Sequence, residues 1–463
     1  MTFDQVLYKY KSAYYNFPNS LKLFLGTVYG SVPLSIRFGS DYTLYSKIIK
    51  KFEDSDDQFR LDYMYNKTLE TLIFSEQNIP YYKDKFLEYG VSSNMFKEIG
   101  DIKLFPELTK DIINNNFNTI TSDKYDKAIT YYSGGSLTQP SKYLLPSMTR
   151  AKEKAYNDYI FSKINFNNRD KTLLLKGREL SNIEKNIYWD YDPIENYLFL
   201  SNNYLNSDKF PIMYQKAFDF KPKIIFGYPS SIISFIKQLE LHGFKKINPE
   251  AILLASETVY PDDYKIIQDY FNTDILSHYG HTERSVIGYR VNNGKYHFLN
   301  SYGLTRVDEN SIVSTTYDNL VMPLINYKGG DEVIGDVEYY DNSDIAKTVD
   351  NISGRTQDFL VTKDYRLVSI TTMCGGQHLP RGIDSIQYLQ DEVGKVNVLV
   401  EGSDINTKEV EQGLYKLVRD GITFNVKHTE KIKKSLRGKR IIAKQSLDIE
   451  KIRKTHIKAD NVI

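Results

Sequence analysis

The chain has 463 residues, of which 41% are hydrophobic and 26% charged, as in ordinary folded proteins. This length exceeds what one hydrophobic core usually organises, so we expect about two or three domains. The 60 Lys and Arg residues nearly balance the 59 Asp and Glu residues. The net charge of +1 argues against a nucleic-acid-binding protein, because a phosphate backbone attracts a concentrated positive field. A single cysteine, Cys374, excludes an intrachain disulfide framework and a thiolate zinc site.

The N-terminal region carries no signal peptide pattern, because Asp4 comes early and no long apolar core follows it. The most lipid-like stretch covers residues 23–36, between Lys22 and Arg37. It is too short to span a bilayer and is interrupted by two glycines and a proline, so we expect no transmembrane helix. These features favour a soluble, cytoplasmic protein.

Two stretches in the first third of the chain predict local structure. Residues 54–76 are expected to form a helix, because four apolar side chains recur on roughly one face. The stretch YYSGGSLTQP, residues 131–140, places two adjacent glycines among hydroxyl residues, after a β-prone run and before a proline. Taken alone, it fits either a phosphate-binding loop or an ordinary polar turn.

Residues 223–280 are the most informative region, because three apolar runs typical of buried strands alternate with two helical segments. These are KIIFG (223–227), PSSIISFIKQLELHG (229–243), AILLA (251–255), PDDYKIIQDYFN (261–272) and DILSHYG (274–280). Ser230 or Ser231 can cap the first helix and Gly243 ends it, while Pro261 opens the second. This order predicts an α/β fold with a doubly wound parallel sheet, whose ligands bind past the carboxyl ends of the strands.

The sequence pattern changes after about residue 350. Two strands with a tight turn, a helix and a further strand are expected at residues 382–402, 406–419 and 422–428. The sequence therefore predicts a small C-terminal α+β domain with a ββαβ, ferredoxin-like arrangement. We divide the chain into an N-terminal domain, 1–354, and a C-terminal domain, 355–463.

Six short motifs occur along the chain in the order found in adenylate-forming enzymes. They are SGGSLTQP (133–140), SETVYP (256–261), HYGHTE (278–283), MPLINYKGGD (322–331), SGRTQD (353–358) and LRGK (436–439). On these motifs the chain resembles the adenylate-forming (ANL) superfamily, in particular the phenylacetate–CoA ligase branch and its CapK-like members from polysaccharide clusters. The family uses ATP to convert a carboxylate into an acyl-adenylate and pyrophosphate, and then transfers the acyl group to a nucleophile.

The resemblance assigns the glycine-rich loop, Ser133, Gly134, Gly135 and Ser136, to the β- and γ-phosphates of ATP. Glycines let backbone N–H groups approach phosphates, and the hydroxyls add further donors. No Gly-Lys-Ser/Thr follows, so the loop is not a P-loop. Thr138 stands where the family usually has glycine, and threonine at a position suited to positive φ would cost about 1–2 kcal/mol.

The HYGHTE motif is assigned to ATP and its metal by the same resemblance. Tyr279 stacks on adenine, Thr282 contacts a phosphate oxygen and Glu283 binds Mg²⁺, while His278 and Gly280 complete this wall of the ATP site. A carboxylate beside a triphosphate requires a metal between them, because the bare charges repel. The alternative is a strand-end turn with a solvated charge.

The neighbouring strand end, Ser256, Glu257 and Thr258, is assigned to the adenine and the pocket wall. The family usually has glycine where this chain has Ser256, which is a second departure from the pattern.

Three further residues complete the resemblance. Asp331 accepts the two ribose hydroxyls, a role suited to a group that only accepts hydrogen bonds. Arg355 reaches the ribose at the domain junction, and Lys439 reaches the substrate carboxylate and the α-phosphate, where an ammonium stabilises developing charge. Asn326, where the family often has arginine, and Gln357, at the hinge, are off pattern. GGDEV (329–333) also matches diguanylate cyclases, but that interpretation explains nothing else in the chain.

The resemblance implies ATP and Mg²⁺ as cofactors and a small carboxylic acid as substrate. The acceptor stays open between a thiol, for which coenzyme A would be a further cofactor, and an amine or hydroxyl, for instance on a glycan precursor. Homodimers occur among relatives, so the oligomeric state is open too. We expect the acyl pocket near residues 131–137, 201–204, 228 and 278–281, where Tyr131, Tyr132, Tyr204 and Tyr228 lie.

The alternative function is nucleotide binding with little or no turnover, in a structural role in glycan assembly. It rests on the four departures from the family pattern. Against it stands the joint presence of Glu283, Asp331, Arg355 and Lys439, which favours an enzyme.

Overall fold

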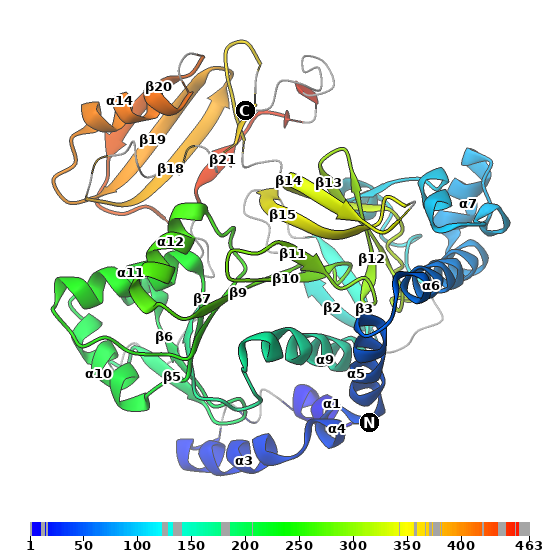
Figure 1. Ribbon diagram of the computed structural model, residues 1–463, viewed down its shortest axis with the longest axis horizontal. Coiled ribbons are helices and arrows are strands. Elements are labelled where there is room, and N and C mark those ends of the chain that lie inside the picture. The colour runs from blue at the N-terminus through cyan, green and yellow to red at the C-terminus, as the bar shows by residue number, and fades with distance from the viewer. Residues whose placement is uncertain are drawn as a thin grey trace.

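The computed structural model describes most of the chain. The described residues are 2–10, 14, 17–122, 128–132, 141–176, 186–205, 207–341, 343–355, 359–365, 367–369, 373, 380, 382–418, 421–433, 441–449 and 451–452. Figure 1 shows a central sheet with helices on both sides and a separate, smaller sheet at one end. None of the helices in these ranges is both long and apolar enough to cross a membrane.

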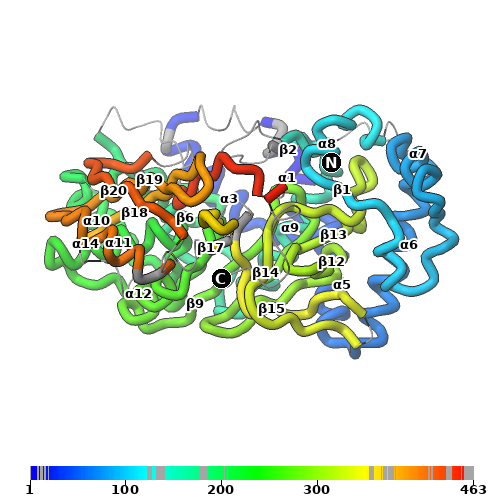
Figure 2. Tube along the Cα trace, turned by 90° about the horizontal axis from the view of Figure 1, so that it is seen from above, coloured from blue at the N-terminus to red at the C-terminus, as the bar shows by residue number. Residues whose placement is uncertain are grey.

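Helices make up most of the first 120 residues. They are α1 (Phe3–Lys9), α3 (Asn19–Ser31), α4 (Leu34–Arg37), α5 (Gly39–Glu53), α6 (Asp57–Asn78), α7 (Pro80–Tyr89) and α8 (Lys110–Asn115), with short 3₁₀ turns at Ser93–Met95 and Ile99–Leu104. The helix predicted at 54–76 is confirmed as α6. It begins at Asp57 because the Asp56 carboxylate accepts a hydrogen bond from the Phe59 N–H at 2.9 Å and caps the first turn. Figure 2 shows α6 and α7 at the opposite end of the molecule from the C-terminal sheet.

A 13-stranded mixed sheet forms the centre of the molecule, in the order β12-β13-β14-β15-β11-β10-β9-β8-β7-β4-β6-β5, with β1 paired to β14. The strands are β1 (Leu108–Thr109), β4 (Thr172–Leu175), β5 (Trp189–Asp192), β6 (Tyr197–Leu200), β7 (Ile224–Gly227), β8 (Ala251–Ala255), β9 (Asp274–Gly280), β10 (Ile287–Val291), β11 (Tyr296–Phe298), β12 (Gly303–Asp308), β13 (Ser311–Thr316), β14 (Tyr327–Tyr339) and β15 (Ala346–Arg355). Five adjacent strands, β6, β4, β7, β8 and β9, run parallel. Their carboxyl ends therefore share one edge of the sheet.

The predicted strand–helix–strand–helix–strand unit is confirmed as β7, α11 (Pro229–Leu241), β8, α12 (Pro261–Phe271) and β9. Gly243 follows α11 with φ +61°, the left-handed conformation that ends many helices. The predicted cap of α11 is wrong: Tyr228 occupies the N-cap position, and no side chain caps from there. Pro229 is the first helical residue, and the Ser230 N–H and hydroxyl donate to the Glu257 carboxylate instead, at 3.3 and 3.1 Å.

Two apolar clusters cover the two faces of the parallel strands. One face packs on α10 (Phe210–Phe220), α11 and α12, and includes Ile225, Leu254 and Ile275. The other packs on α5 and α9 (Thr149–Phe161), and includes Leu253 and Leu276. The near-continuous apolar runs of these strands follow from burial on both sides.

The C-terminal residues form a four-stranded sheet in the order β20-β19-β18-β21. Its elements are β18 (Ile383–Glu392), β19 (Lys395–Gly402), α14 (Thr407–Val418), β20 (Thr423–His428) and β21 (Ala443–Gln445), and a β16–β17 hairpin (Phe359–Val361, Leu367–Ser369) precedes them. The predicted ββαβ order is confirmed, with Gly394 at φ +73° in the tight turn. Tyr260, at the start of α12, packs into this module's apolar cluster, and Lys237 pairs with Asp384 at 3.1 Å.

Candidate active site

The candidate site lies at the carboxyl ends of the parallel strands, where Lys176, Tyr228, Ser256 and Gly280 follow or end β4, β7, β8 and β9. Parallel strands bring these positions together although they are up to about a hundred residues apart in sequence. The hairpin of β2 (Ala128–Tyr132) and β3 (Lys142–Pro146) flanks the glycine-rich loop. The loop itself, with Ser133, Gly134, Gly135, Ser136 and Thr138, lies outside the described residues.

His278 and Tyr279 point to opposite faces of β9, because successive side chains of a strand alternate. His278 faces α9, where its Nε2 lies 3.0 Å from Oδ1 of Asn157 and its ring packs edge-on against Phe161. Burial, together with the nearby positive charges of Lys176 and Arg284, lowers the pKa of His278 to about 3. The imidazole is therefore neutral at physiological pH, and its Nε2–H donates to the Asn157 oxygen.

Tyr279 faces the other way and meets His281 and Asp331. The Tyr279 hydroxyl donates to Oδ2 of Asp331 at 2.9 Å, and Nε2 of His281 lies 2.8 Å from the same oxygen. Burial and the Asp331 carboxylate raise the pKa of Tyr279 well above its ordinary value, so the phenol stays protonated. Gly329 leaves room for the imidazole, because a Cβ at that position would lie 2.9 Å from Cε1 of His281. The sequence analysis assigned His281 no role of its own, although it lies inside the HYGHTE motif.

Glu283 is a buried carboxylate in the turn after β9, with 8% of its surface exposed. The Tyr327 hydroxyl donates to its Oε1 at 3.2 Å, and the Tyr143 hydroxyl lies 3.2 Å from that of Tyr327. Burial and the Glu283 charge raise the pKa of Tyr327 well above its ordinary value, which keeps the hydroxyl a donor. Thr282 is half-buried in the same turn.

A lone, fixed carboxylate is compatible with Mg²⁺ carried by a triphosphate. Mg²⁺ typically takes one or two protein carboxylates and fills its remaining positions with phosphate oxygens and water. Within the described ranges, no group of three or more His, Cys, Asp and Glu side chains could hold a metal ion by itself. Glu283 therefore fits a metal that arrives with its nucleotide.

The SET stretch combines a strained backbone with a helix contact. Ser256 has φ +69°, a left-handed conformation in which glycine is normally preferred. The backbone thus keeps, with a serine, a conformation that suits the glycine usual in the family. Glu257 lies where the N–H groups of α11 begin and accepts two hydrogen bonds from Ser230, while Thr258 is half-buried beside it.

Asn326 has a structural role in place of the arginine that the family often has. Its side-chain amide donates to the carbonyl oxygens of Ile102 and Phe105 at 2.7 and 2.9 Å, and 2% of the residue is exposed. This departure from the family pattern ties a 3₁₀ turn of the N-terminal helical region to the central sheet.

A charged cluster that the sequence analysis missed supports the turn after β9 on the side of α9. Arg284 has φ +56° and pairs with Glu153 of α9, which also accepts a hydrogen bond from the Tyr302 hydroxyl. Beside it, Nζ of Lys152 lies 2.9 Å from Asp318 and donates to the Tyr302 carbonyl at 2.7 Å. A cavity of about 20 Å³, the size of one water molecule, lies among these side chains. The fold brings together residues about 150 positions apart, so no local sequence signal could have identified the cluster.

The remaining predicted site residues are only partly placed. Asp331 and Arg355 are paired positions on β14 and β15, so the structure brings their backbones side by side. The side chain of Arg355 and the residues Gln357 and Lys439 lie outside the described residues.

The predicted acyl pocket is also placed in part. Tyr228 is buried at the start of α11, and Tyr204 packs against Tyr188 with ring centroids 4.8 Å apart. The guanidinium of Arg284 lies 5.9 Å from the ring of Tyr131, while the side chain of Tyr132 lies outside the described residues.

A cavity of about 700 Å³ lies elsewhere, along α12 between that helix and the β10 and β15 strands. Tyr264, Arg290, Lys295 and Asp350 are among its lining residues, and none of the predicted site residues belongs to the lining. This cavity is therefore separate from the candidate site at the strand ends.

Comparisons with known proteins agree with this architecture. No family model matches the chain. The chain is 22% identical to Protein CapK of Staphylococcus aureus over 380 residues, which cover 79% of this chain and 83% of that protein. It is also similar to the crystal structure of 2-hydroxyisobutyryl-CoA ligase in the postadenylation state in complex with R3-HIB-AMP. That match has a TM-score of 0.64 at 10% sequence identity, and it covers 86% of this chain and 93% of the other. An open conformation of that ligase, in complex with 2-HIB-AMP and CoA, gives a TM-score of 0.53 at 13% identity, over 87% and 91% of the two chains. The chain has the fold of the adenylate-forming acid–CoA ligases, and the predicted α/β fold class is confirmed.

Proposed function

We propose that this protein is an ATP-dependent, AMP-forming ligase that activates a small carboxylic acid as its acyl-adenylate. In the first step, a carboxylate oxygen attacks the α-phosphorus of ATP and pyrophosphate leaves. In the second, an acceptor attacks the acyl carbon and AMP leaves. The fold is compatible with this chemistry, and the motifs of the family supply the residues for it.

Two carboxylates at the carboxyl end of β9 carry the proposal. Glu283, in the turn that follows the strand, is rigidly held by Tyr327, and Asp331 is held by Tyr279 and His281 from the strand and the turn. An ionised carboxylate only accepts hydrogen bonds and has about four lone-pair sites, so Glu283 and Asp331 can each bind a further partner beside these donors. Mg²⁺-bound triphosphate and a ribose diol are partners that suit them.

The nucleotide would lie on the Tyr279 side of β9. Glu283 would hold Mg²⁺, which neutralises charge on the phosphates when bound. Asp331 would accept the ribose hydroxyls, and Arg355, its neighbour on β15, would reach the same sugar. Ser133 to Ser136 would bind the outer phosphates, and Thr282 one phosphate oxygen.

The acid would lie toward α9, on the His278 side. There the neutral imidazole, the aromatic rings of Phe161 and Phe226 and the ammonium of Lys176, 3.7 Å from the centre of the Phe226 ring, surround the strand end. A positive charge in a partly apolar wall suits an acid that carries polar groups besides its reacting carboxylate.

The C-terminal module would act as a mobile lid. We propose the division at 354/355, with Lys439 delivered by the lid to the reacting carboxylate and the α-phosphate, where it would stabilise the transition state. The acceptor would be coenzyme A or an amine or hydroxyl of a surface-polysaccharide precursor, as the resemblance to CapK-like proteins suggests. A cytoplasmic location is part of the proposal, because ATP is the substrate.

The test is to incubate the protein with ATP, Mg²⁺ and separate pools of aryl, amino, hydroxy and uronic acids, and to measure AMP and pyrophosphate. We expect one pool to yield both products, and Lys439→Ala to lose them while retaining ATP binding. Lys431→Ala, in the same basic stretch, is the matched control and should keep activity. ATP binding without AMP from any pool would favour the alternative, a nucleotide-binding protein with little or no turnover.

A further inference from the structure

Helix α3 packs against the body of the protein through glycines. A Cβ at Gly26 would lie 2.4 Å from Cγ of Pro193, and one at Gly30 would lie 2.4 Å from the carbonyl oxygen of Ile194. Only glycine permits so close an approach of the helix to this loop. The small residues of α3 therefore face inward.

The opposite side of α3 exposes large apolar side chains. Leu21, Phe24, Leu25 and Val28 follow the i, i+3, i+4, i+7 spacing of one helical face and are 40%, 64%, 37% and 53% exposed. Within the described residues, eleven of the twenty-two exposed large apolar side chains lie in the first 44 positions. A helix that served only the fold would turn such a stripe toward the core, so this orientation indicates contact with an apolar medium or partner.

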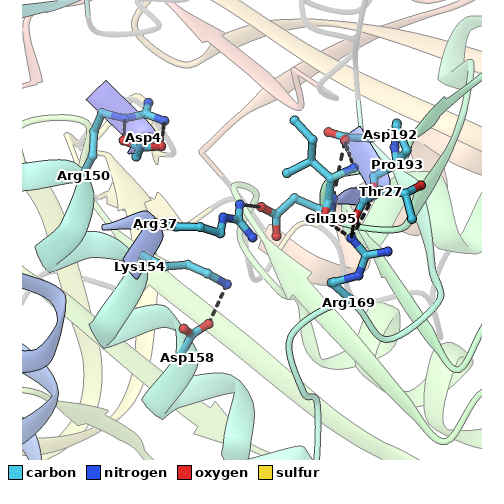
Figure 3. A network of polar contacts seen from close by, with 11 residues as sticks. Asp4, Thr27, Arg37, Arg150, Lys154, Asp158, Arg169, Asp192, Pro193 and Glu195 are labelled. Atoms are coloured by element: carbon cyan, nitrogen blue, oxygen red, sulfur yellow. Dashed lines mark hydrogen bonds and ion pairs between the residues drawn. The ribbon is translucent and has the colours of Figure 1, made fainter. Parts of the chain in front are cut away.

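Polar contacts fix the N-terminal helices in this orientation (Figure 3). Nη1 of Arg169 lies 3.4 Å from the carbonyl oxygen of Thr27 in α3, and it also contacts the carbonyls of Pro193 and Ile194. Arg37, after α3, pairs with Glu195 at 2.7 Å. Asp4 of α1 accepts two hydrogen bonds from Arg150, at 2.7 and 2.9 Å. The outward direction of the apolar face is thus built into the structure.

The charges around α3 indicate which medium it meets. Residues 5–36 contain Lys9, Lys11 and Lys22 but no Asp or Glu. A cationic segment with an apolar helical face is attracted to anionic lipid headgroups and inserts its apolar side chains at the headgroup boundary. A second copy of the same face would instead bring like charges together.

We propose that α3 docks the protein on an anionic lipid surface, with Leu21, Phe24, Leu25 and Val28 inserted into the interface and the helix lying parallel to the membrane. Figure 1 places α3 along one edge of the molecule, on the opposite side from the C-terminal sheet. Docking through α3 would therefore leave the C-terminal module free of the membrane. This inference does not depend on the proposed ligase activity.

The test is sedimentation of the full-length protein with vesicles of phosphatidylcholine alone or mixed with phosphatidylglycerol in roughly equal parts. We expect binding to the mixed vesicles that weakens as salt rises. The double variant Phe24→Ser/Leu25→Ser should reduce the bound fraction at least about 10-fold. The matched control Leu87→Ser/Leu241→Ser removes two side chains that are 83% and 75% exposed elsewhere and should bind like the unmodified protein.

A second readout reports insertion directly. Phe24→Trp keeps the position apolar and adds a second tryptophan to Trp189. The fluorescence emission of this variant should shift to the blue when the mixed vesicles are added, whereas the emission of the unmodified protein, which comes from Trp189 alone, should stay constant. Absence of binding to mixed vesicles, equal binding by the double variant and the unmodified protein, or an unshifted spectrum would each overturn the proposal. So would light scattering that detects an α3-dependent dimer without vesicle binding, since the partner would then be a second copy.

Discussion

Helices α11 and α3 are both 13 residues long and rich in apolar residues, yet they use those residues in opposite ways. In α11, Ile232, Phe235, Ile236 and Leu239 are buried against the parallel sheet. In α3 the glycines are buried and the large side chains face outward. The comparison teaches that apolar composition alone does not indicate which side of a helix faces the core. The element against which the helix packs determines it: the parallel sheet for α11, and the loop with Pro193 and Ile194 for α3.

The largest difference between the two helices should appear in stability. Phe235→Ala empties a fully buried site in α11 and is expected to lower the free energy of unfolding by about 3–5 kcal/mol. Phe24→Ala removes the same ring from an exposed site in α3 and should change it by less than about 0.5 kcal/mol. Chemical denaturation of both variants measures the contrast, and similar losses would show that α3 is packed against something in solution.

The half-buried His278 near the end of β9 makes stability depend on pH. Its pKa lies near 3 in the folded protein, against 6.5 in an unfolded chain, so the unfolded state binds more protons below pH 6.5. Stability is therefore full above pH 6.5 and declines as pH falls toward 3, by about 1–2 kcal/mol at about pH 5. Denaturation of His278→Gln at several pH values should give a shallower acid decline than the unmodified protein. Parallel declines would contradict a neutral His278.

The ion pair at the end of α4, the short helix that follows α3, should have a local effect. Arg37 is 2% exposed and its partner Glu195 is 25% exposed, so Arg37→Met leaves a partly solvated charge and should cost about 1–2 kcal/mol. Hydrogen exchange should accelerate in residues 19–31 more than in α11. Lys154→Met, which breaks the half-buried pair with Asp158 on α9, is the matched control and should cost less than about 0.5 kcal/mol. Unchanged exchange in α3 would mean that the pair does not hold the helix.

The smallest expected effect concerns the strained serine at the end of β8. Ser256→Gly relieves the left-handed conformation and should raise stability by about 1 kcal/mol or less. A thermal melt detects the shift, and Ser301→Gly, at a position outside the left-handed conformation, should not be stabilising. Loss of stability in Ser256→Gly would indicate that the hydroxyl makes a contact that matters more than the strain.

The sequence predicted the parallel unit well, because short apolar runs alternate there at regular spacing with helices that begin at Pro229 and Pro261. Its errors came from contacts between distant residues. Glu257 replaces the expected serine cap of α11, and the pairing of Arg284 with Glu153 depends on α9 lying beside the turn after β9. The short strand β21 has three residues and is defined only by its pairing with β18. The outward direction of the apolar face of α3 could not be predicted either. It depends on the contact of Gly26 and Gly30 with the loop that contains Pro193 and Ile194.

The central claim is acid-dependent adenylation at the carboxyl end of β9, and exchange of labelled pyrophosphate into ATP tests it most directly. With the acid identified by AMP release, we expect exchange in the unmodified protein, at least about 100-fold less in Glu283→Gln, and full exchange in Glu338→Gln, an exposed glutamate on β14. Exchange that persists in Glu283→Gln, or that never depends on an acid, would contradict the account.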